Sequence, residues 1–141
     1  MNFFTKKCKN GNDIGLLILR LVFAIVLIYG HGFDKLSVIF SGQEIQFMDP
    51  IGIGPKLSFY LATFAEGICS ILLLLGLFTR LSALVLTMNF IVIFIFHAFM
   101  VGDGFVILEP RFFYLFAFIA LVFTGAGKFS LDYLLFRKKG E

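Results

Sequence analysis

The sequence predicts an all-α membrane protein, a four-transmembrane-helix bundle with a short C-terminal interfacial helix. Of its 141 residues 60% are hydrophobic and only 15% are charged, and the mean hydropathy is +0.98. A soluble domain typically carries ~25% charged residues, so this composition is typical of a chain that folds in lipid. Four long apolar runs separated by breaker residues predict a single transmembrane domain over residues 1–141.

The first span is expected over about residues 14–33 and contains an arginine. On a helix Arg20, His31 and Lys35 share one face because they are spaced by whole numbers of turns. A charge that faces lipid at mid-bilayer costs ~2.5–3.5 kcal/mol on insertion scales, so this face is predicted to point into protein. Residues 36–55 mix glycine and proline with apolar residues, which predicts a connector at the interface or folded back over the bundle.

The other three spans are expected over about residues 56–77, 81–101 and 110–125. Glu66 interrupts the second span, and Asn89 and His97 interrupt the third. Pro110 suits the first turn of the fourth span, where its missing N–H needs no partner. After a glycine-rich break, residues 128–136 predict a brief amphipathic helix at the surface, with Ser130 as its N-cap.

Positive charge predicts the orientation of the bundle. Four spans place both ends of the chain on one side, and Lys and Arg are enriched in cytoplasmic segments. Basic residues gather at the two ends and in one tight turn: Lys6, Lys7, Lys9, Arg80, Lys128, Arg137, Lys138 and Lys139. We therefore expect both termini in the cytoplasm, with basic ends that favour anionic lipid. The net charge of +3 follows from this topology and does not indicate a nucleic-acid partner.

Three polar side chains are expected to meet near mid-membrane. At ~1.5 Å per residue from the cytoplasmic ends of the spans, Arg20, Glu66 and Asn89 lie at similar depths. An ion pair between Arg20 and Glu66, with Asn89 as a hydrogen-bonding neighbour, would offset the penalty of burying each charge. Two interpretations remain open: the network only fixes helix register, or it lines a pocket for a polar or redox-active head group.

A second polar layer is expected toward the outer face. His31 and His97 come from different spans at similar depth, and Lys35, Glu109 and Arg111 lie near the same mouth. We expect the two histidines to face one another beside Glu109. Histidines inside membranes serve in proton relays and as metal ligands, so proton transfer to a bound molecule, a divalent metal site and a purely structural pair all remain open. No local ligand spacing supports a metal, and no metal site is assigned.

Several short motifs follow one another along the chain. They are L-R-L at Leu19–Leu21, H-G-F-D-K at His31–Lys35, L-L-L-G-L-F-T-R at Leu73–Arg80 and G-A-G-K-F-S-L-D at Gly125–Asp132, with His97, Gly104 and Glu109 among them. Over about residues 14–133 this ordered set resembles the DoxX family of small bacterial four-span membrane proteins. The stretch G-D-G-F-V-I-L-E-P-R departs from the more aromatic approach to the last span expected of the family, which leaves the role of Glu109 open.

The resemblance implies an inner-membrane subunit of a quinone-linked redox system, connected with sulfur-compound oxidation or oxidative or thiol stress. The candidate cofactor-binding residues are Arg20, Lys35, Glu66 and Asn89. The candidate catalytic residues, which exchange protons with a quinone, are His31, His97 and Glu109. The chain holds no redox centre, so electrons would come from a soluble or membrane partner subunit, and a second copy of the chain is a further candidate partner. The alternative is a non-enzymatic scaffold or small-solute carrier with the same polar core.

Overall fold

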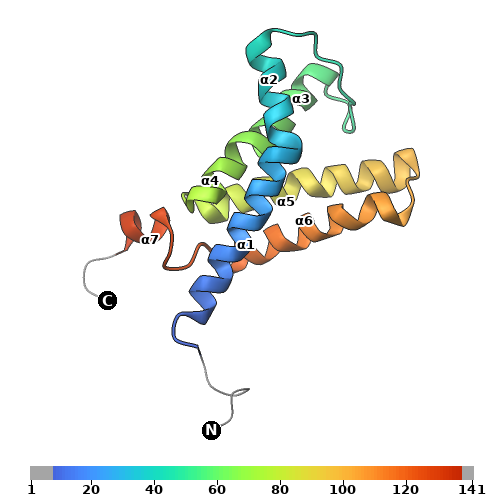
Figure 1. Ribbon diagram of the computed structural model, residues 1–141. Helices are drawn as coiled ribbons and strands as arrows, with labels where there is room; N and C mark the ends of the chain where they lie inside the picture. The colour runs from blue at the N-terminus through green and yellow to red at the C-terminus, as the bar shows by residue number, and fades with distance from the viewer. Residues whose placement is uncertain (1–7, 138–141) are drawn as a thin grey trace.

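The computed structural model describes residues 8–137, which form four long helices and a short terminal one (Figure 1). All four long helices are long and apolar enough to cross a membrane. They span Gly11–Ser41, Pro55–Leu75, Thr79–Val101 and Phe105–Thr124. The short helix α7 covers Leu131–Phe136, and Ser130 caps it by accepting a hydrogen bond from the Tyr133 N–H. The predicted fold class and the terminal helix are confirmed.

The first long helix is longer than its sequence predicts. It consists of α1 (Gly11–Leu27), a π-helical segment η1 (Ile28–Gly32) and α2 (Phe33–Ser41). It ends at Gly42, whose φ of 67° is the left-handed conformation that terminates helices. The connector therefore begins at Gly42 instead of residue 36, because nothing before that glycine breaks the helix. At about 1.5 Å per residue the helix is longer than the ~30 Å hydrocarbon core, so one end extends beyond it.

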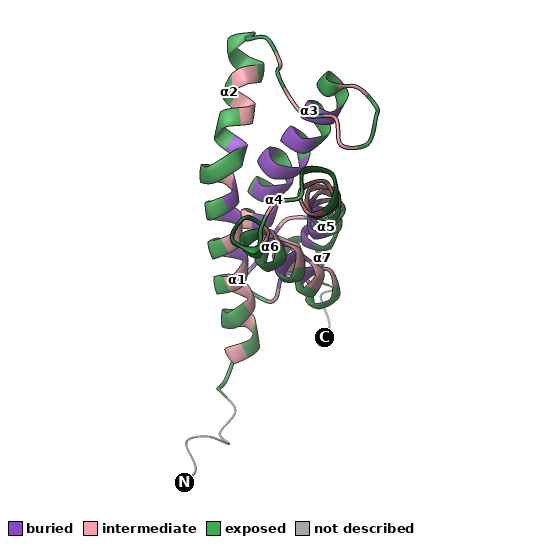
Figure 2. Ribbon diagram, turned by 90° about the vertical axis from the view of Figure 1, so that its right-hand side faces the viewer, coloured by how far each residue is buried: buried purple, intermediate pink, exposed green. Residues whose placement is uncertain are grey.

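The second long helix is the central one. It consists of α3 (Pro55–Thr63), π-helical η2 (Phe64–Cys69) and α4 (Ser70–Leu75). Over its most apolar stretch 56% of the residues are buried, against 17%, 17% and 22% in the other three long helices. Figure 2 shows these buried residues gathered along α3 and α4. The other helices shield this one from lipid, and it is therefore the helix on which a charged side chain can be buried.

The third and fourth long helices form a hairpin. They are α5 (Thr79–Ile95) with π-helical η3 (Phe96–Val101), and α6 (Phe105–Thr124). Aromatic rings join them: Phe90 stacks on Tyr114 with ring centroids 4.8 Å apart and also contacts Phe118. The hairpin crosses α1 steeply in Figure 1 and is viewed nearly end-on in Figure 2, so the four helices are splayed.

The start of α6 differs from the expected position. The helix begins at Phe105, so Pro110 lies inside it and not in its first turn. The apolar segment Phe105–Leu108 explains the difference, because the membrane favours a helix in which the backbone groups are paired. A proline inside a membrane helix is tolerated when other groups satisfy the freed backbone. Beside the Val106 carbonyl, which Pro110 cannot pair, the guanidinium of Arg111 donates a hydrogen bond to the carbonyl of Ile107.

Asp49, in the connector between the first two long helices, organises the start of α3. Its carboxylate accepts hydrogen bonds from the N–H groups of Ile53 and Gly54 and from the Ser58 hydroxyl, at 3.0, 2.8 and 2.9 Å. Desolvation of the carboxyl raises the pKa of Asp49, but these hydrogen bonds outweigh it and hold the pKa below its usual value.

We expect this cap to weaken in acid. A lowered folded pKa stabilises the fold above the unfolded pKa of ~3.9, and that stabilisation is lost as the pH falls through the folded pKa. Amide hydrogen exchange at Ile53 and Gly54 should therefore accelerate in acid, and Asp49→Asn should remove this pH dependence. Glu44→Gln, at an exposed connector residue, is the matched control and should retain it. If the wild-type amides show no acid-dependent loss of protection, Asp49 does not cap α3.

Candidate functional site

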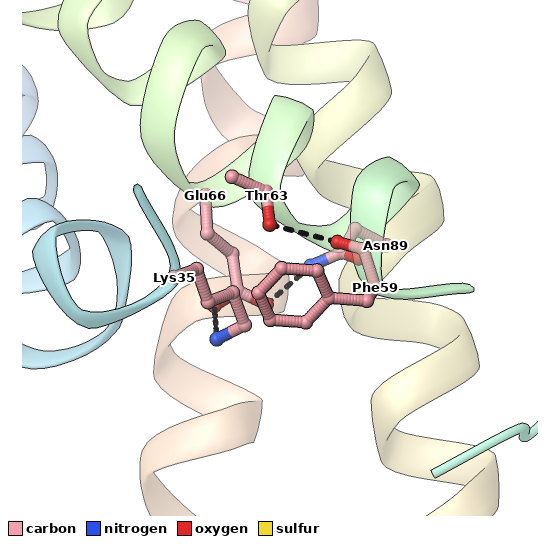
Figure 3. Close-up of polar contacts among 5 residues, drawn as sticks. All are labelled: Lys35, Phe59, Thr63, Glu66 and Asn89. Carbon is pink, nitrogen blue, oxygen red and sulfur yellow. Dashed lines mark hydrogen bonds and ion pairs between the residues drawn. The ribbon is translucent and has the colours of Figure 1, made fainter. Parts of the chain in front are cut away.

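The main polar site surrounds Glu66, a buried acidic side chain that is 3% exposed. Lys35 from α2 donates a hydrogen bond to Glu66 Oε2 at 2.7 Å, and Asn89 from α5 donates one to Oε1 at 3.0 Å (Figure 3). Three long helices thus each contribute one member of the network. Both carboxylate oxygens are satisfied, and one ammonium balances the charge, which is what a buried carboxylate requires.

Aromatic side chains surround this ion pair. Lys35 Nζ lies 6.0 Å from the ring centroid of Phe47, a distance at which a cation interacts with a ring face. Phe59 is buried on the helix that carries Glu66, and Figure 3 includes it with Thr63, whose hydroxyl donates to the Phe59 carbonyl at 2.8 Å. The site therefore combines one acid, two hydrogen-bond donors and an apolar aromatic border.

Three candidate residues lie in π-helical turns. His31 is in η1, Glu66 in η2 and His97 in η3. Such turns are rare and occur frequently at functional sites. At Gly32 the first two helices approach backbone to backbone, because a Cβ there would lie 2.8 Å from the Glu66 carbonyl oxygen. This close approach holds Lys35 within reach of Glu66.

A second polar site lies at the turn between η3 and α6. His97 Nδ1 is 2.5 Å from Asp103 Oδ2, and His97 Nε2 is 3.1 Å from Arg111 Nη2. The side chains of His97 and Asp103 are 17% and 19% exposed. Sequence reasoning placed Arg111 near the outer mouth but did not identify it, or Asp103, as a site residue. The available signal was an acid in the Gly-Asp-Gly turn just after the histidine-bearing span.

The histidines do not pair as expected. Both ring nitrogens of His97 are occupied by Asp103 and Arg111, so they are not bonded to His31. His31 is exposed and interacts electrostatically with charged groups of both polar sites, Glu66 and Lys35 in one and Arg111 in the other. Glu109 is exposed and makes no ion pair with any residue that the structure describes. Within residues 8–137 no three His, Cys, Asp or Glu side chains gather closely enough to hold a metal ion.

The predicted ion pair between Arg20 and Glu66 is wrong. Arg20 is 1% exposed and donates hydrogen bonds to the carbonyl oxygens of Leu73 and Phe129, at 3.2 and 2.6 Å. Leu73 lies in the last turn of α4, where a cation is favoured, and its carbonyl also accepts a hydrogen bond from the Gly76 N–H at 3.1 Å. The depth argument assumed parallel helices. The helices are splayed, so that Lys35 and not Arg20 reaches Glu66. Arg20 therefore belongs to a structural contact at the opposite end of α4 and not to the Glu66 site.

The segment around Phe129, whose carbonyl binds Arg20, also closes the end of the molecule at which α1 begins and α6 ends. Asp132 accepts hydrogen bonds from the N–H groups of Phe78 and Thr79 at 2.7 and 2.8 Å, and its own N–H donates to the Gly76 carbonyl. Because α5 has no capping side chain at Phe78, Asp132 supplies the missing acceptor from a distant part of the chain. The sequence motif around Gly76 and the one ending at Asp132 thus form a single contact.

Comparison with known protein families gives one match, and the matched range contains most of the candidate site residues. The model of the DoxX family matches residues 15–98. This range includes Lys35, Glu66 and Asn89 together with His31 and His97, and it ends before Asp103 and Arg111. No match was found among curated proteins or among solved structures.

Proposed function

The chain belongs to the DoxX family, and from that premise we propose that it is the membrane subunit of a quinone-linked redox system, serving sulfur-compound oxidation or the response to oxidative or thiol stress. The observation that carries the proposal is the Lys35–Glu66–Asn89 network, which is a balanced carboxylate inside a membrane helix. Ionisable residues in such positions commonly serve proton transfer. We place the proton-exchange site at Glu66, with Lys35 and Asn89 as its donors.

The residues fit the needs of a quinone head group. Its carbonyl oxygens require hydrogen-bond donors, which Lys35 and Asn89 provide, and its hydroxyl protons require an acceptor, which Glu66 provides. Its ring requires an apolar aromatic border, and Phe47 and Phe59 supply one. A bound quinone would supply two-electron, two-proton redox chemistry, which this chain lacks.

The roles of the protein groups follow from their contacts. The Lys35 ammonium balances the charge of the Glu66 carboxylate and donates a hydrogen bond to it. Electrons for a bound quinone would come from a partner subunit, and Glu66 would be the residue that exchanges protons with its oxygens. Asn89 can exchange its donated hydrogen bond between Glu66 and the ligand, because its amide has two N–H groups.

Binding of a reduced short-chain quinone to the protein in lipid nanodiscs tests this function. We expect a saturable absorbance change for the wild type. In Glu66→Gln the affinity should fall about tenfold or more, because hydrogen bonds to charged groups are worth ~1.5–3 kcal/mol. Asn89→Leu leaves the ion pair in place and should weaken binding as well, whereas Glu44→Gln should have no effect. Absence of saturable wild-type binding, or equal affinity in Glu66→Gln, would contradict the proposal.

The alternative of a non-enzymatic scaffold has one observation in its favour. Both oxygens of Glu66 are already satisfied by donors of the protein itself, as in a network that only fixes helix positions. The binding experiment separates the two functions, because a scaffold would melt at lower temperature in Glu66→Gln and would bind quinone in neither form.

We also propose that the protein lies in a bacterial inner membrane with both termini in the cytoplasm. Lys9, Lys128 and Arg137 lie near the two ends of the described chain, and Arg80 lies at the end of the molecule that Asp132 closes. This is the arrangement that the positive-inside rule predicts. Lys6, Lys7, Lys138 and Lys139 support the same orientation from the sequence and lie outside the described residues.

Labelling of single cysteines in intact cells checks this orientation. In a Cys8→Ser background, a membrane-impermeant maleimide should react with Gln46→Cys in the connector and not with Arg80→Cys. Both positions are exposed on the protein surface, so the side of the membrane on which each cysteine lies decides whether it reacts. Labelling at position 80 alone would reverse the proposed topology. Permeabilised cells serve as the control, since both cysteines should then react.

A further inference from the structure

The hydrogen bonds of His97 determine where its ring carries hydrogen. Arg111 Nη2 lies 3.1 Å from Nε2, and a guanidinium can only donate. Nε2 must therefore accept, so it carries no hydrogen. Nδ1 lies 2.5 Å from a carboxylate oxygen of Asp103, so Nδ1 carries the hydrogen and donates it. These contacts select the neutral Nδ1–H tautomer of His97.

A proton at Nε2 and the Arg111 contact exclude one another. When a proton binds the Nε2 lone pair, both that nitrogen and the guanidinium become donors, and their hydrogen bond is lost. The bond from Nδ1 to Asp103 is unchanged. The summed charge of Asp103, His97 and Arg111 rises from zero to +1, so Arg111 is repelled from the ring. No other bond forms or breaks, and release of the proton reverses the change.

Several ionisable groups surround or interact with Arg111 and His97. His31 interacts electrostatically with Arg111, and also with Glu66, Lys35 and Asp34. Asp103, in the turn, is the carboxylate that faces His97 directly. Glu109 belongs to the same part of α6, but it is exposed. A displaced Arg111 therefore changes the electrostatic surroundings of His31.

We propose that His97, Asp103 and Arg111 form a proton-exchange site, at which a proton on Nε2 and the Arg111 guanidinium compete for one position. The site exchanges protons with water on the side of the membrane that the turn at Asp103 faces. An O–H bond of hydronium breaks as an N–H bond forms at His97 Nε2, and no electrons are transferred. The competition at His97 does not depend on the proposed function.

The chain has only two histidines, so ring nitrogens labelled with ¹⁵N give two sets of NMR signals, which His31→Phe assigns. We expect His97 to be the Nδ1–H tautomer at alkaline pH. In Arg111→Leu the proton affinity of His97 should rise about tenfold or more, because the competing donor is gone. Arg111→Gln makes the same prediction if the leucine variant does not fold. Arg80→Leu, at the opposite end of α5, should leave His97 unchanged. An Nε2–H tautomer, or an unchanged affinity in both Arg111 variants, would overturn the proposal.

Sealed proteoliposomes of known orientation test which side the site serves. The His97 signals should follow the pH of the compartment that the Asp103 turn faces, and Glu66→Gln should leave the His97 tautomer intact. A His97 signal that follows the other compartment would refute this assignment. None of these measurements uses quinone, so a failure to bind quinone refutes the proposed function alone.

Discussion

Replacing Lys35 with methionine is expected to destabilise the protein by about 3–5 kcal/mol, the usual result of leaving one member of a buried ion pair without its partner. The Lys35 side chain is 15% exposed and that of Glu66 is 4% exposed, so water screens little of the interaction. In the variant the Glu66 carboxylate keeps only the hydrogen bond from Asn89. Reversible unfolding in mixed micelles, followed by circular dichroism, measures the change in the free energy of unfolding.

A double-mutant cycle separates this ion pair from simple loss of packing. Lys35→Met combined with Glu66→Leu should be less destabilised than the sum of the two single variants, because the pair is removed as a unit. Lys56→Met, at an exposed residue at the start of α3, is the control for loss of a lysine and should change stability by less than about 0.5 kcal/mol. Additive single effects would show that Lys35 and Glu66 do not interact.

Gly76→Ala is expected to have the other large effect on stability. A Cβ at this position would lie 2.0 Å from Arg20 Nη1 and 2.6 Å from Ser130 Cβ. Arg20 would have to leave the carbonyl oxygens of Leu73 and Phe129, and a buried charge without partners costs several kcal/mol. We expect a loss of at least about 3 kcal/mol in the free energy of unfolding, together with faster proteolysis of the segment 126–137.

Gly42→Ala is the matched control for backbone strain. Gly42 has a φ of 67° and Gly76 a φ of 69°, and each ends a helix in the left-handed conformation. No atom lies within 4 Å of a Cβ at Gly42, so its substitution should cost only the intrinsic ~1–2 kcal/mol. Equal losses at the two positions would mean that the Arg20 contact contributes nothing. Urea or dodecyl sulfate titration of both variants under one condition gives the comparison.

Sequence reasoning succeeded where a property is local to one helix. The length and apolarity of each run predicted four spans, and Ser130 was identified as an N-cap from its place before a short amphipathic segment. The contact between Asn89 and Glu66 was also predicted from their depth. The errors at Gly42 and Pro110 are boundary errors, because apolar flanking residues extend a membrane helix past the point where polarity alone would end it.

The choice of ion-pair partner was not local. Arg20 and Lys35 lie on the same face of one helix, and only the packing of the first two long helices, which approach closely at Gly32, decides which of them reaches Glu66 (Figure 1). Helix crossing angles depend on how the ridges and grooves of two helix surfaces fit together. The residue pattern of a single helix does not determine that fit. The same limitation explains why Arg111 was not assigned to His97, since its contact depends on where α6 begins.

The sequence by itself determined the membrane environment, the four spans, the family and the presence of unusual charges inside apolar runs, because each depends on composition, hydropathy or short motifs. The tertiary structure alone decided that Arg20 holds the segment ending in α7 while Lys35 and Asn89 satisfy Glu66. It also decided that His97 bonds Asp103 and Arg111. The physical reason is that a hydrogen bond requires its partners to lie within about 3.2 Å, and for side chains on different helices that distance is determined by the tilt, rotation and crossing of whole helices.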